Sequence, residues 1–243
     1  MKIVTISDTH NRHKEISLGS GDILIHSGDA TGRGQSGEIE PFLKWYGKQD
    51  FTYKIFVAGN HDWGFEREPE RYEAMCKKYG VIYLNDSGYT IQDFDTGKDI
   101  KIWGSPVQPT FCNWAFNRDI EFIVHEDPYH GIKRHPLIKP HWDLIPNDTD
   151  ILITHGPPEG ILDDVPIHSA ISGSVEHVGC PHLRDAILNR VKPKLHVFGH
   201  IHPKNGIMMV NGIMFNNAAN LNDAYTYEYK PRVIEWQDGP KIK

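Results

Sequence analysis

Short apolar runs recur along the chain, and most of them end directly in a small polar loop. Such runs, when Gly, Asp, Asn or His follows them, are typical of buried strands that end at a functional edge. We predict five strands of this kind, at residues 3–6, 23–25, 54–57, 151–153 and 195–198. Shorter runs indicate hairpins and a second sheet, at residues 81–84, 89–92, 100–103, 206–210, 213–216 and 232–236.

Helical patterns lie between some of these strands. The clearest covers residues 36–47, where a period of 3.6 residues runs through Ile39, Phe42, Leu43 and Tyr46. Residues 68–78 and 180–191 are further helical candidates. This alternation predicts an α/β fold, with helices covering both sheets, whose ligands bind beyond the carboxyl ends of the strands.

Residues 105–150 differ from the rest, because they are rich in Pro, His and aromatic residues and have weak periodicity. We predict a structured loop or cap over the active site there, and a second rim element at residues 166–177. Four histidines in the first segment either lie in a solvated loop or contact phosphate: His125, His130, His135 and His141. No repeat or linker divides the chain, so we expect one domain over residues 1–243.

The composition excludes several classes of protein. A chain of 243 residues can bury one large core. The 32 acidic residues outnumber the 26 scattered basic ones, which argues against a long nucleic acid and favours a small phosphorylated substrate. The three cysteines have no C-x-x-C spacing, so we expect a reducing cytoplasm and no disulfide framework. No stretch approaches the roughly 20 apolar residues that a membrane span needs.

Histidine is the unusual residue, with 15 copies, and it prompts a search for metal ligands. Asp8-x-His10 follows the first predicted strand, where an extended backbone would aim both side chains at one ion. Gly28-Asp29 follows the second strand, where Gly permits a tight turn and Asp supplies a carboxylate able to bridge two ions. Either motif alone could equally be a helix cap or a turn.

A more informative motif follows the third strand: Gly59-Asn60-His61-Asp62. Two further motifs follow the fourth and fifth strands: His155-Gly156 and Gly199-His200-x-His202. A single one could be an Asx turn or a core histidine. Because all five motifs follow strands, adjacent carboxyl ends would bring their side chains to one edge. Oxygen and nitrogen ligands without thiolate favour Mn²⁺, Fe, Zn²⁺ or Ni²⁺.

The ordered motifs D-x-H, G-D, G-N-H-D, H and G-H-x-H resemble those of the calcineurin-like metallophosphoesterase superfamily. Five segments are similar to its metallophosphoesterase-domain-containing branch, which includes brain-type and bacterial phosphodiesterases: Trp103-Gly104-Ser105-Pro106, Asn113-Trp114-Ala115-Phe116-Asn117, residues 151–158, Val178-Gly179-Cys180 and residues 196–202. The resemblance implies a four-layer α-β-β-α sandwich of two mixed sheets flanked by helices, with a loop-rich cap.

The resemblance also implies two divalent ions, with Mn²⁺ the expected metal, that share the carboxylate of Asp29. The ligands would be Asp8, His10, Asp29 and His202 for the first ion and Asp29, Asn60, His155 and His200 for the second. His61 would contact the phosphate or protonate the leaving oxygen, and Asp62 would orient it; alternatively, Asp62 only caps the following turn. Asn60, His61 and Trp114 would contact substrate, although each aromatic residue could instead serve ordinary packing.

The implied activity is hydrolysis of small phosphodiesters, with 2′,3′- or 3′,5′-cyclic nucleotides as the expected substrates. The implied mechanism is in-line attack of a hydroxide held between two ions roughly 3.5–4 Å apart. One alternative is a phosphomonoesterase, either a protein phosphatase or a nucleotidase, but no Arg-rich phosphate clamp follows the third motif. The other is a non-catalytic metal-binding scaffold, against which the full ligand set and His61 argue.

Overall fold

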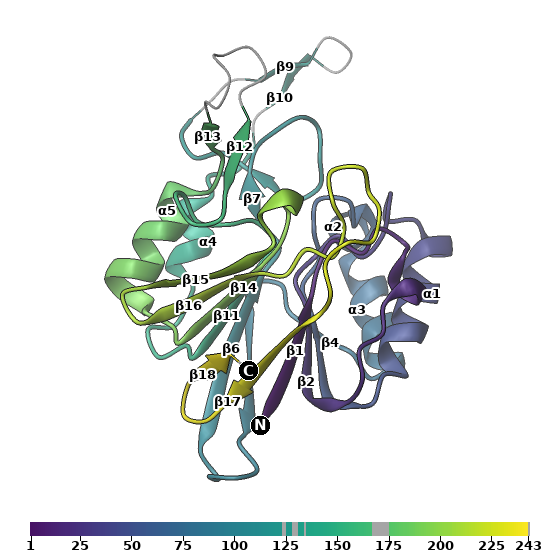
Figure 1. Ribbon diagram of the computed structural model, residues 1–243. Coiled ribbons are helices and arrows are strands. Elements are labelled where there is room, and N and C mark those ends of the chain that lie inside the picture. The colour runs from purple at the N-terminus through teal and green to yellow at the C-terminus, as the bar shows by residue number, and fades with distance from the viewer. Residues whose placement is uncertain (123–124, 128–130, 134, 167–174, 243) are drawn as a thin grey trace.

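Two six-stranded mixed sheets lie face to face, and helices cover the outer face of each (Figure 1). The computed structural model describes residues 1–122, 125–127, 131–133, 135–166 and 175–242. The predicted α/β sandwich of four layers is therefore confirmed. Among the described residues, no helix has the length and apolar character needed to cross a membrane.

The first sheet contains the strands that precede the first three motifs. Its order is β18 (Pro240–Ile242), β17 (Arg232–Trp236), β1 (Lys2–Ile6), β2 (Gly21–His26), β3 (Phe51–Phe56) and β4 (Ile82–Tyr83). Strands β1 to β4 are parallel, whereas β17 pairs with β1 in the antiparallel sense. The carboxyl ends of β1, β2 and β3 consequently meet at one edge.

The second sheet contains the strands that precede the last two motifs. Its order is β15 (Gly206–Val210), β16 (Ile213–Asn217), β14 (Leu195–Phe198), β11 (Ile151–Thr154), β6 (Asp99–Ser105) and β5 (Ser87–Gln92). The four inner strands are parallel, and β15 and β5 close the sheet as antiparallel edges. Every predicted strand overlaps a strand of one of the two sheets.

Alternation along the strands explains the layers, because successive side chains of a strand point to opposite faces. In β1, Ile3 packs between the sheets while Val4 packs under the helices. In β14, Val197 packs between the sheets while Phe198 faces the helices of the second sheet. Because these strands are buried on both faces, their sequences are nearly continuous apolar runs, and for this reason the strands could be predicted from the sequence.

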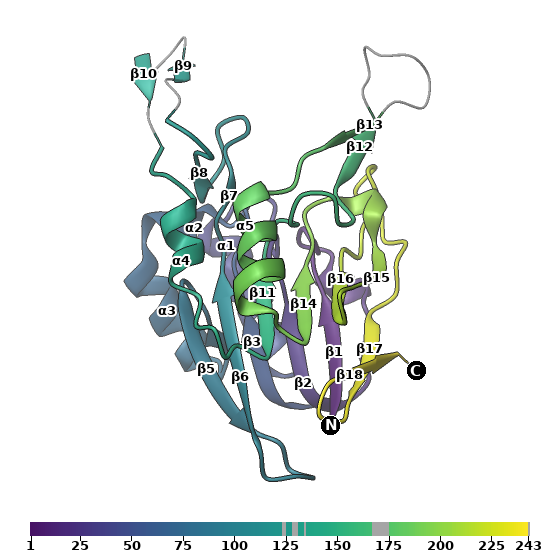
Figure 2. The same ribbon diagram turned by 90° about the vertical axis from the view of Figure 1, so that its left-hand side faces the viewer.

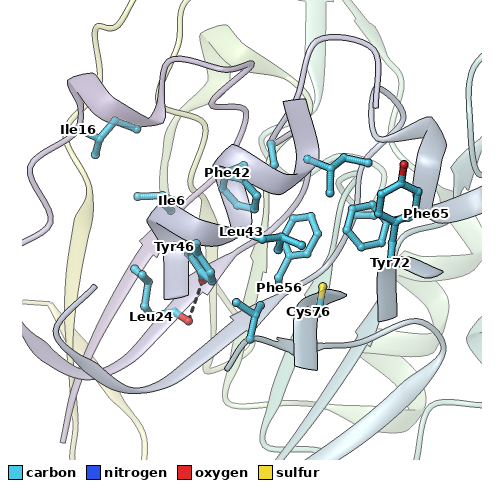
Figure 3. Close-up of a cluster of buried hydrophobic side chains, with 14 of the residues drawn as sticks. Ile6, Ile16, Leu24, Phe42, Leu43, Tyr46, Phe56, Phe65, Tyr72 and Cys76 are labelled. Atoms are coloured by element: carbon cyan, nitrogen blue, oxygen red, sulfur yellow. Dashed lines mark hydrogen bonds between the residues drawn. The ribbon is translucent and has the colours of Figure 1, made fainter. Parts of the chain in front are cut away.

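The helices fall into two groups, one on each sheet (Figures 1 and 2). The first group is α1 (Ser36–Gly47), α2 (Trp63–Arg67) and α3 (Pro69–Lys78); the second is α4 (Lys139–Asp143) and α5 (Pro181–Asp185), which continues as a π-helical turn, Ala186–Val191. Figure 3 shows Phe42, Leu43 and Tyr46 of α1 packed beside Phe56 of β3. The Tyr46 hydroxyl donates to the carbonyl oxygen of Leu24 at 3.1 Å, which fixes α1 on the sheet.

Several small strands stand at the end of the molecule toward which the parallel strands point (Figure 2). They are β7 (Gln108–Pro109), β8 (Asn117–Arg118), β9 (His125–Asp127), β10 (Gly131–Lys133), β12 (Asp164–Pro166) and β13 (Val175–His177). Two short 3-10 turns complete the elements, η1 (His13–Glu15) and η3 (His202–Lys204).

Residues 105–150 contribute to the core as well as to the rim, since Trp142 of α4 is buried among the side chains of the second helical layer. His141 does not lie free in a solvated loop: its Nδ1 donates to Asp86 at 2.7 Å, and its Nε2 accepts from Arg118 at 3.1 Å. The side chains of His125 and His130 lie outside the described part of the chain.

Candidate metal centre

The seven predicted metal ligands come together where the carboxyl ends of the two sheets meet. Asp8 and His10 follow β1, Asp29 follows β2 and Asn60 follows β3, whereas His155, His200 and His202 follow strands β11 and β14 of the second sheet. Three triads have their ligand atoms within 4.8 Å of one another: Asp8, His10 and His202; Asp29, His155 and His200; and His10, Asp29 and His61. Both sheets therefore supply each predicted ion site.

The backbone presents four of these ligands in the left-handed region. The φ angles are 53° at Asp8, 37° at His10, 54° at Asp29 and 70° at His200. The prediction that Asp8 and His10 project from an extended strand is therefore wrong, because β1 ends at Ile6 and the chain turns immediately afterwards. Non-glycine residues in this region cost of order 1–3 kcal/mol each and persist at functional sites where the surroundings hold them.

The Asp29 carboxylate lies at the centre of the ligand set. Its Oδ2 is 3.7 Å from Nε2 of His10 and 3.4 Å from Nε2 of His155, and its Oδ1 accepts the backbone N–H of His61 at 2.8 Å. Burial would raise the pKa of Asp29, but the neighbouring His155 imidazole outweighs it and holds the pKa well below its usual range. A buried carboxylate that stays ionised between two groups of imidazoles is suited to bridge two cations.

Backbone carbonyls fix the orientation of two ligand imidazoles. Nδ1 of His155 lies 3.0 Å from the carbonyl oxygen of Ser27, and Nδ1 of His202 lies 3.1 Å from that of Asn222. A carbonyl oxygen only accepts, so Nδ1 carries the proton and donates in both rings. The Nε2 lone pairs are left to face the centre, an arrangement that is usual for metal-binding histidine.

Several of the inward-facing atoms lie within hydrogen-bond distance of one another, although they are acceptors or can act as acceptors. Nε2 of His155 is 2.8 Å from Oδ1 of Asn60, and Nε2 of His10 is 3.3 Å from Nε2 of His202. Such pairs are repulsive unless a proton or a cation lies between them. The side-chain Nδ1 of His10 is also buried without a hydrogen-bond partner among the described residues. The residues therefore fit two divalent cations, with oxygen and imidazole donors and no thiolate.

The protonation of the ligand histidines follows the same logic. Burial disfavours the imidazolium of His155, yet the Asp29 carboxylate outweighs burial and raises the pKa to about 9. Burial is likewise outweighed at His202, where the hydrogen bond to Asp8 raises the pKa to about 9. At His10 burial prevails and lowers the pKa to about 4. The raised pKa values of His155 and His202 show that the carboxylates favour positive charge in this centre, which bound cations would supply in place of protons.

Glycine is required beside three of the ligands because the loops that carry the ligands approach one another closely. A Cβ atom on Gly199 would lie 2.1 Å from Oδ2 of Asp8, and one on Gly59 would lie 2.3 Å from Oδ1 of Asp29. A Cβ atom on Gly28 would lie 2.2 Å from Nδ1 of His155. The glycines of the G-D, G-N-H-D and G-H-x-H motifs thus give the ligands room.

His61 adjoins the ligand set, with Nε2 4.0 Å from Oδ2 of Asp29. Its Nδ1 donates to the carbonyl oxygen of Gly32 at 2.8 Å, so that carbonyl, and not Asp62, orients the ring. The Asp62 carboxylate instead accepts the backbone N–H groups of Gly59, Ala30 and Thr31, which ties the loop after β2 to the loop after β3. Neither the predicted contact with the His61 ring nor a side-chain cap of α2 is found in the described structure.

Aromatic rings surround His61 and His10. The Trp114 ring lies 4.1 Å, centroid to centroid, from the ring of His61. The Tyr225 ring lies 4.8 Å from His10 and 5.2 Å from His202. Sequence reasoning missed Tyr225, because it lies in a turn that follows no predicted strand and carries no motif.

Two cavities open beside the ligands. The larger, of about 1170 Å³, is lined by residues that include His200, His202, Tyr225, Glu176 and Asp223. The smaller, of about 500 Å³, extends from His200 toward the hairpin of β12 and β13. A small substrate can therefore reach both predicted ion sites from solvent.

The comparisons with known proteins agree with this centre. Residues 1–204 match the calcineurin-like phosphoesterase family. The chain is 36% identical to the human metallophosphoesterase domain-containing protein 1 over 96% of its own length and 70% of that protein, and 30% identical to a UPF0046 protein of Caenorhabditis elegans over 96% and 74%.

A solved structure shares the fold. Phosphopantetheinyl hydrolase from Mycobacterium tuberculosis superposes with a TM-score of 0.57 and 18% identity, over 92% of this chain and 90% of that one. The sequence matches carry the family assignment, and the clustered aspartates and histidines supply the ligands that its chemistry needs. The chain belongs to the calcineurin-like phosphoesterase family and is a metal-dependent phosphoester hydrolase.

Proposed function

We propose that the chain is a dinuclear phosphodiesterase for small phosphodiesters, with cyclic nucleotides as the leading candidates. The observation that carries the proposal is the position of Asp29 Oδ2, within 4.0 Å of the Nε2 atoms of three imidazoles that come from both sheets: His10, His61 and His155. A bridging carboxylate at this point would divide the seven ligands into two sites, as the motifs imply.

The charge around the cavities supports diesters over monoesters. Neither cavity beside the centre has Lys or Arg among the described residues that line it, while Glu159, Glu176 and Asp223 do line them. A diester carries one negative charge on phosphorus, whereas a monoester carries about two near neutral pH and would meet stronger repulsion from these carboxylates. A cationic clamp, which would favour a monoester, is not among the described lining residues.

Divalent ions, when bound, would supply Lewis acidity toward the phosphoryl oxygens and an activated water. His61 Nε2 would contact the phosphoryl oxygen or protonate the leaving oxygen, and this role is supported by the hydrogen bond of Nδ1 to the Gly32 carbonyl oxygen, which leaves Nε2 for the substrate. Asp62 would act through the loop that positions His61, and Trp114 would limit the movement of the His61 ring and contact substrate. Asn60 would serve both as ligand and as substrate contact.

Mn²⁺ is the metal we expect, since carboxylate, amide and imidazole donors suit it. The cytoplasm is the compartment we propose, because all three cysteines are free: Cys76, Cys112 and Cys180. The roles proposed for the side chains depend neither on which metal is bound nor on the compartment.

The test is a comparison of two chromogenic esters with protein loaded with Mn²⁺. We expect bis-p-nitrophenyl phosphate to be hydrolysed with a higher kcat/KM than p-nitrophenyl phosphate, followed by turnover of 2′,3′- or 3′,5′-cyclic nucleotides. Asn60→Ala is the control, because it removes a predicted ligand while leaving the Asp29 bridge. Equal turnover by this variant would attribute the signal to a contaminant, and a preference for the monoester would refute the assignment to diesters.

A further inference from the structure

The smaller cavity begins at a predicted metal ligand and is mainly apolar. His200 lines it at one end, and the hairpin of β12 and β13 lines it at the other. The apolar part of the wall includes Pro109, Ile120, Pro157, Val165, Val178 and Pro181. A volume of about 500 Å³ lies within the usual range for a pocket that holds a small organic group.

The smaller cavity is continuous with the larger one. Phe111, Val165, His200 and Ile201 line both, and the Phe111 ring lies 5.1 Å from the His200 ring. A phosphodiester bound at the predicted ions would therefore have one ester group next to this opening. The apolar wall makes that group the natural occupant of the cavity.

One polar side chain of the cavity is held in a fixed orientation. Nδ1 of His177 donates to Oδ1 of Asp163 at 2.8 Å, and the buried Asp163 accepts the backbone N–H groups of Gly160 at 2.9 Å and Gly179 at 3.0 Å through its other oxygen. The hydrogen bond to Asp163 raises the pKa of His177. Within the described part of the chain, Nε2 of His177 has no hydrogen-bond partner. His177, whose side chain is 53% exposed, is thus a directed donor for a ligand.

The charges of the cavity restrict the kind of group that it would bind. No Lys or Arg belongs to its described lining, and the carboxylate of Glu159 does. A second phosphate would therefore be disfavoured, and the imidazole of His177 already has Asp163 as its partner. A neutral, planar ring with acceptor atoms satisfies both the apolar wall and the directed donor.

We propose that this cavity is a specificity subsite that binds the base of a nucleotide ester, with His177 donating from Nε2 to a ring acceptor and Asp163 holding His177 in position. The proposal rests on the proposed function, because the phosphate of the same substrate is placed at the ions. His177 would determine specificity without taking part in the cleavage of the phosphoester.

The test measures binding by calorimetry on metal-loaded protein, with three probes that differ in one group each: inorganic phosphate, ribose 5-phosphate and adenosine 5′-monophosphate. We expect the nucleotide to bind at least about tenfold more tightly than ribose 5-phosphate, which is a typical gain for one buried base. His177→Ala should remove about tenfold of this affinity and leave the affinity for inorganic phosphate unchanged. His177→Gln, which keeps a donor, should retain most of it.

Two further variants separate the subsite from the folding of the hairpin. Val178→Asp places a charge in the apolar wall and should lower nucleotide affinity, whereas Val175→Ala, in the same hairpin but outside the cavity lining, should not. Equal binding of the nucleotide and ribose 5-phosphate, or wild-type binding by both His177→Ala and Val178→Asp, would overturn the subsite. Binding of the nucleotide that depends on His177, without any hydrolysis of phosphodiesters, would instead overturn the proposed function alone.

Discussion

Replacing Gly199 by alanine tests whether the close approach of the two sheets builds the metal centre. The added Cβ would lie 2.1 Å from Asp8 Oδ2 and from Ser7 Oγ. Since real Cβ atoms essentially never make contacts below 3.0 Å, the Asp8 carboxylate would have to retreat by at least 3.0 − 2.1 = 0.9 Å. The φ angle of Gly199 lies outside the left-handed region, so backbone strain does not contribute.

A displacement of this size is large for a ligand. Both carboxylate oxygens of Asp8 accept the N–H of His200, at 3.1 and 3.0 Å, so the shift also disturbs the second sheet. Ligand distances in metal sites vary by only about 0.2 Å. We expect Gly199→Ala to bind Mn²⁺ about 10–100-fold more weakly and to lose about 1–3 kcal/mol of unfolding free energy in the metal-free protein.

The assay combines metal titration by calorimetry with urea denaturation of the metal-free protein. Gly206→Ala is the matched control, because its Cβ would meet the Lys204 carbonyl oxygen at 3.7 Å and Leu162 Cδ2 at 3.8 Å, which are ordinary contacts. Wild-type metal affinity in Gly199→Ala, together with unchanged stability, would refute the steric argument and with it the role of Asp8 as a ligand.

Three other substitutions address the catalytic residue, the core and acid stability. His61→Ala should lower kcat by about 10²–10⁴-fold at unchanged metal content, and full turnover by the metal-loaded variant would contradict the proton-donor role. Tyr46→Phe should lower the unfolding free energy, measured in urea, by about 1–2 kcal/mol. The reason is that the buried hydroxyl lies 3.1 Å from the carbonyl oxygen of Leu24 and 2.7 Å from that of Ile55. An unchanged midpoint of urea denaturation would count against a stabilising role of these hydrogen bonds. Burial lowers the pKa of His196 to about 3. Below about pH 6.5 the His196 ring is therefore protonated in the unfolded chain but not in the folded chain. The unfolding free energy should accordingly fall by about 1.4 kcal/mol per pH unit from pH 6.5 toward pH 3 because of this group. His196→Gln should reduce that slope between pH 6 and 5, and identical slopes would show that the ring is protonated in the folded state.

The elements that the sequence predicts best are those in which one local signal decides the structure. The run at residues 195–198 coincides with β14, and the helical period at residues 36–47 coincides with α1. Helices α2 and α4 were not predicted, because five residues are too few to display a helical period. Strand β18 pairs with β17 at the edge of the first sheet and carries too short an apolar pattern to be recognised.

The candidate site was predictable in its residue types but not in its backbone or its surroundings. The motifs indicate which atoms can bind a metal, whereas the left-handed backbone at Asp8 and His10 depends on contacts with the loop after β2, where Asp8 N–H donates to the Gly28 carbonyl oxygen. Tyr225 is held by distant partners, since Arg12 donates to its carbonyl oxygen at 2.6 Å. Contacts between residues so far apart in the sequence produce no periodic pattern from which they could be predicted.

The pairing of β1 with β17 gives the metal centre a place in the order of folding. Lys2 lies opposite Glu235, and the carbonyl oxygen of Asn222 orients His202, so the last part of the chain completes a centre whose predicted ligands all precede residue 203. A chain that is still being synthesised will have exposed every ligand before β1 gains its second neighbour. Contacts between such distant segments close slowly. We therefore expect the centre to be among the last parts of the molecule to become ordered.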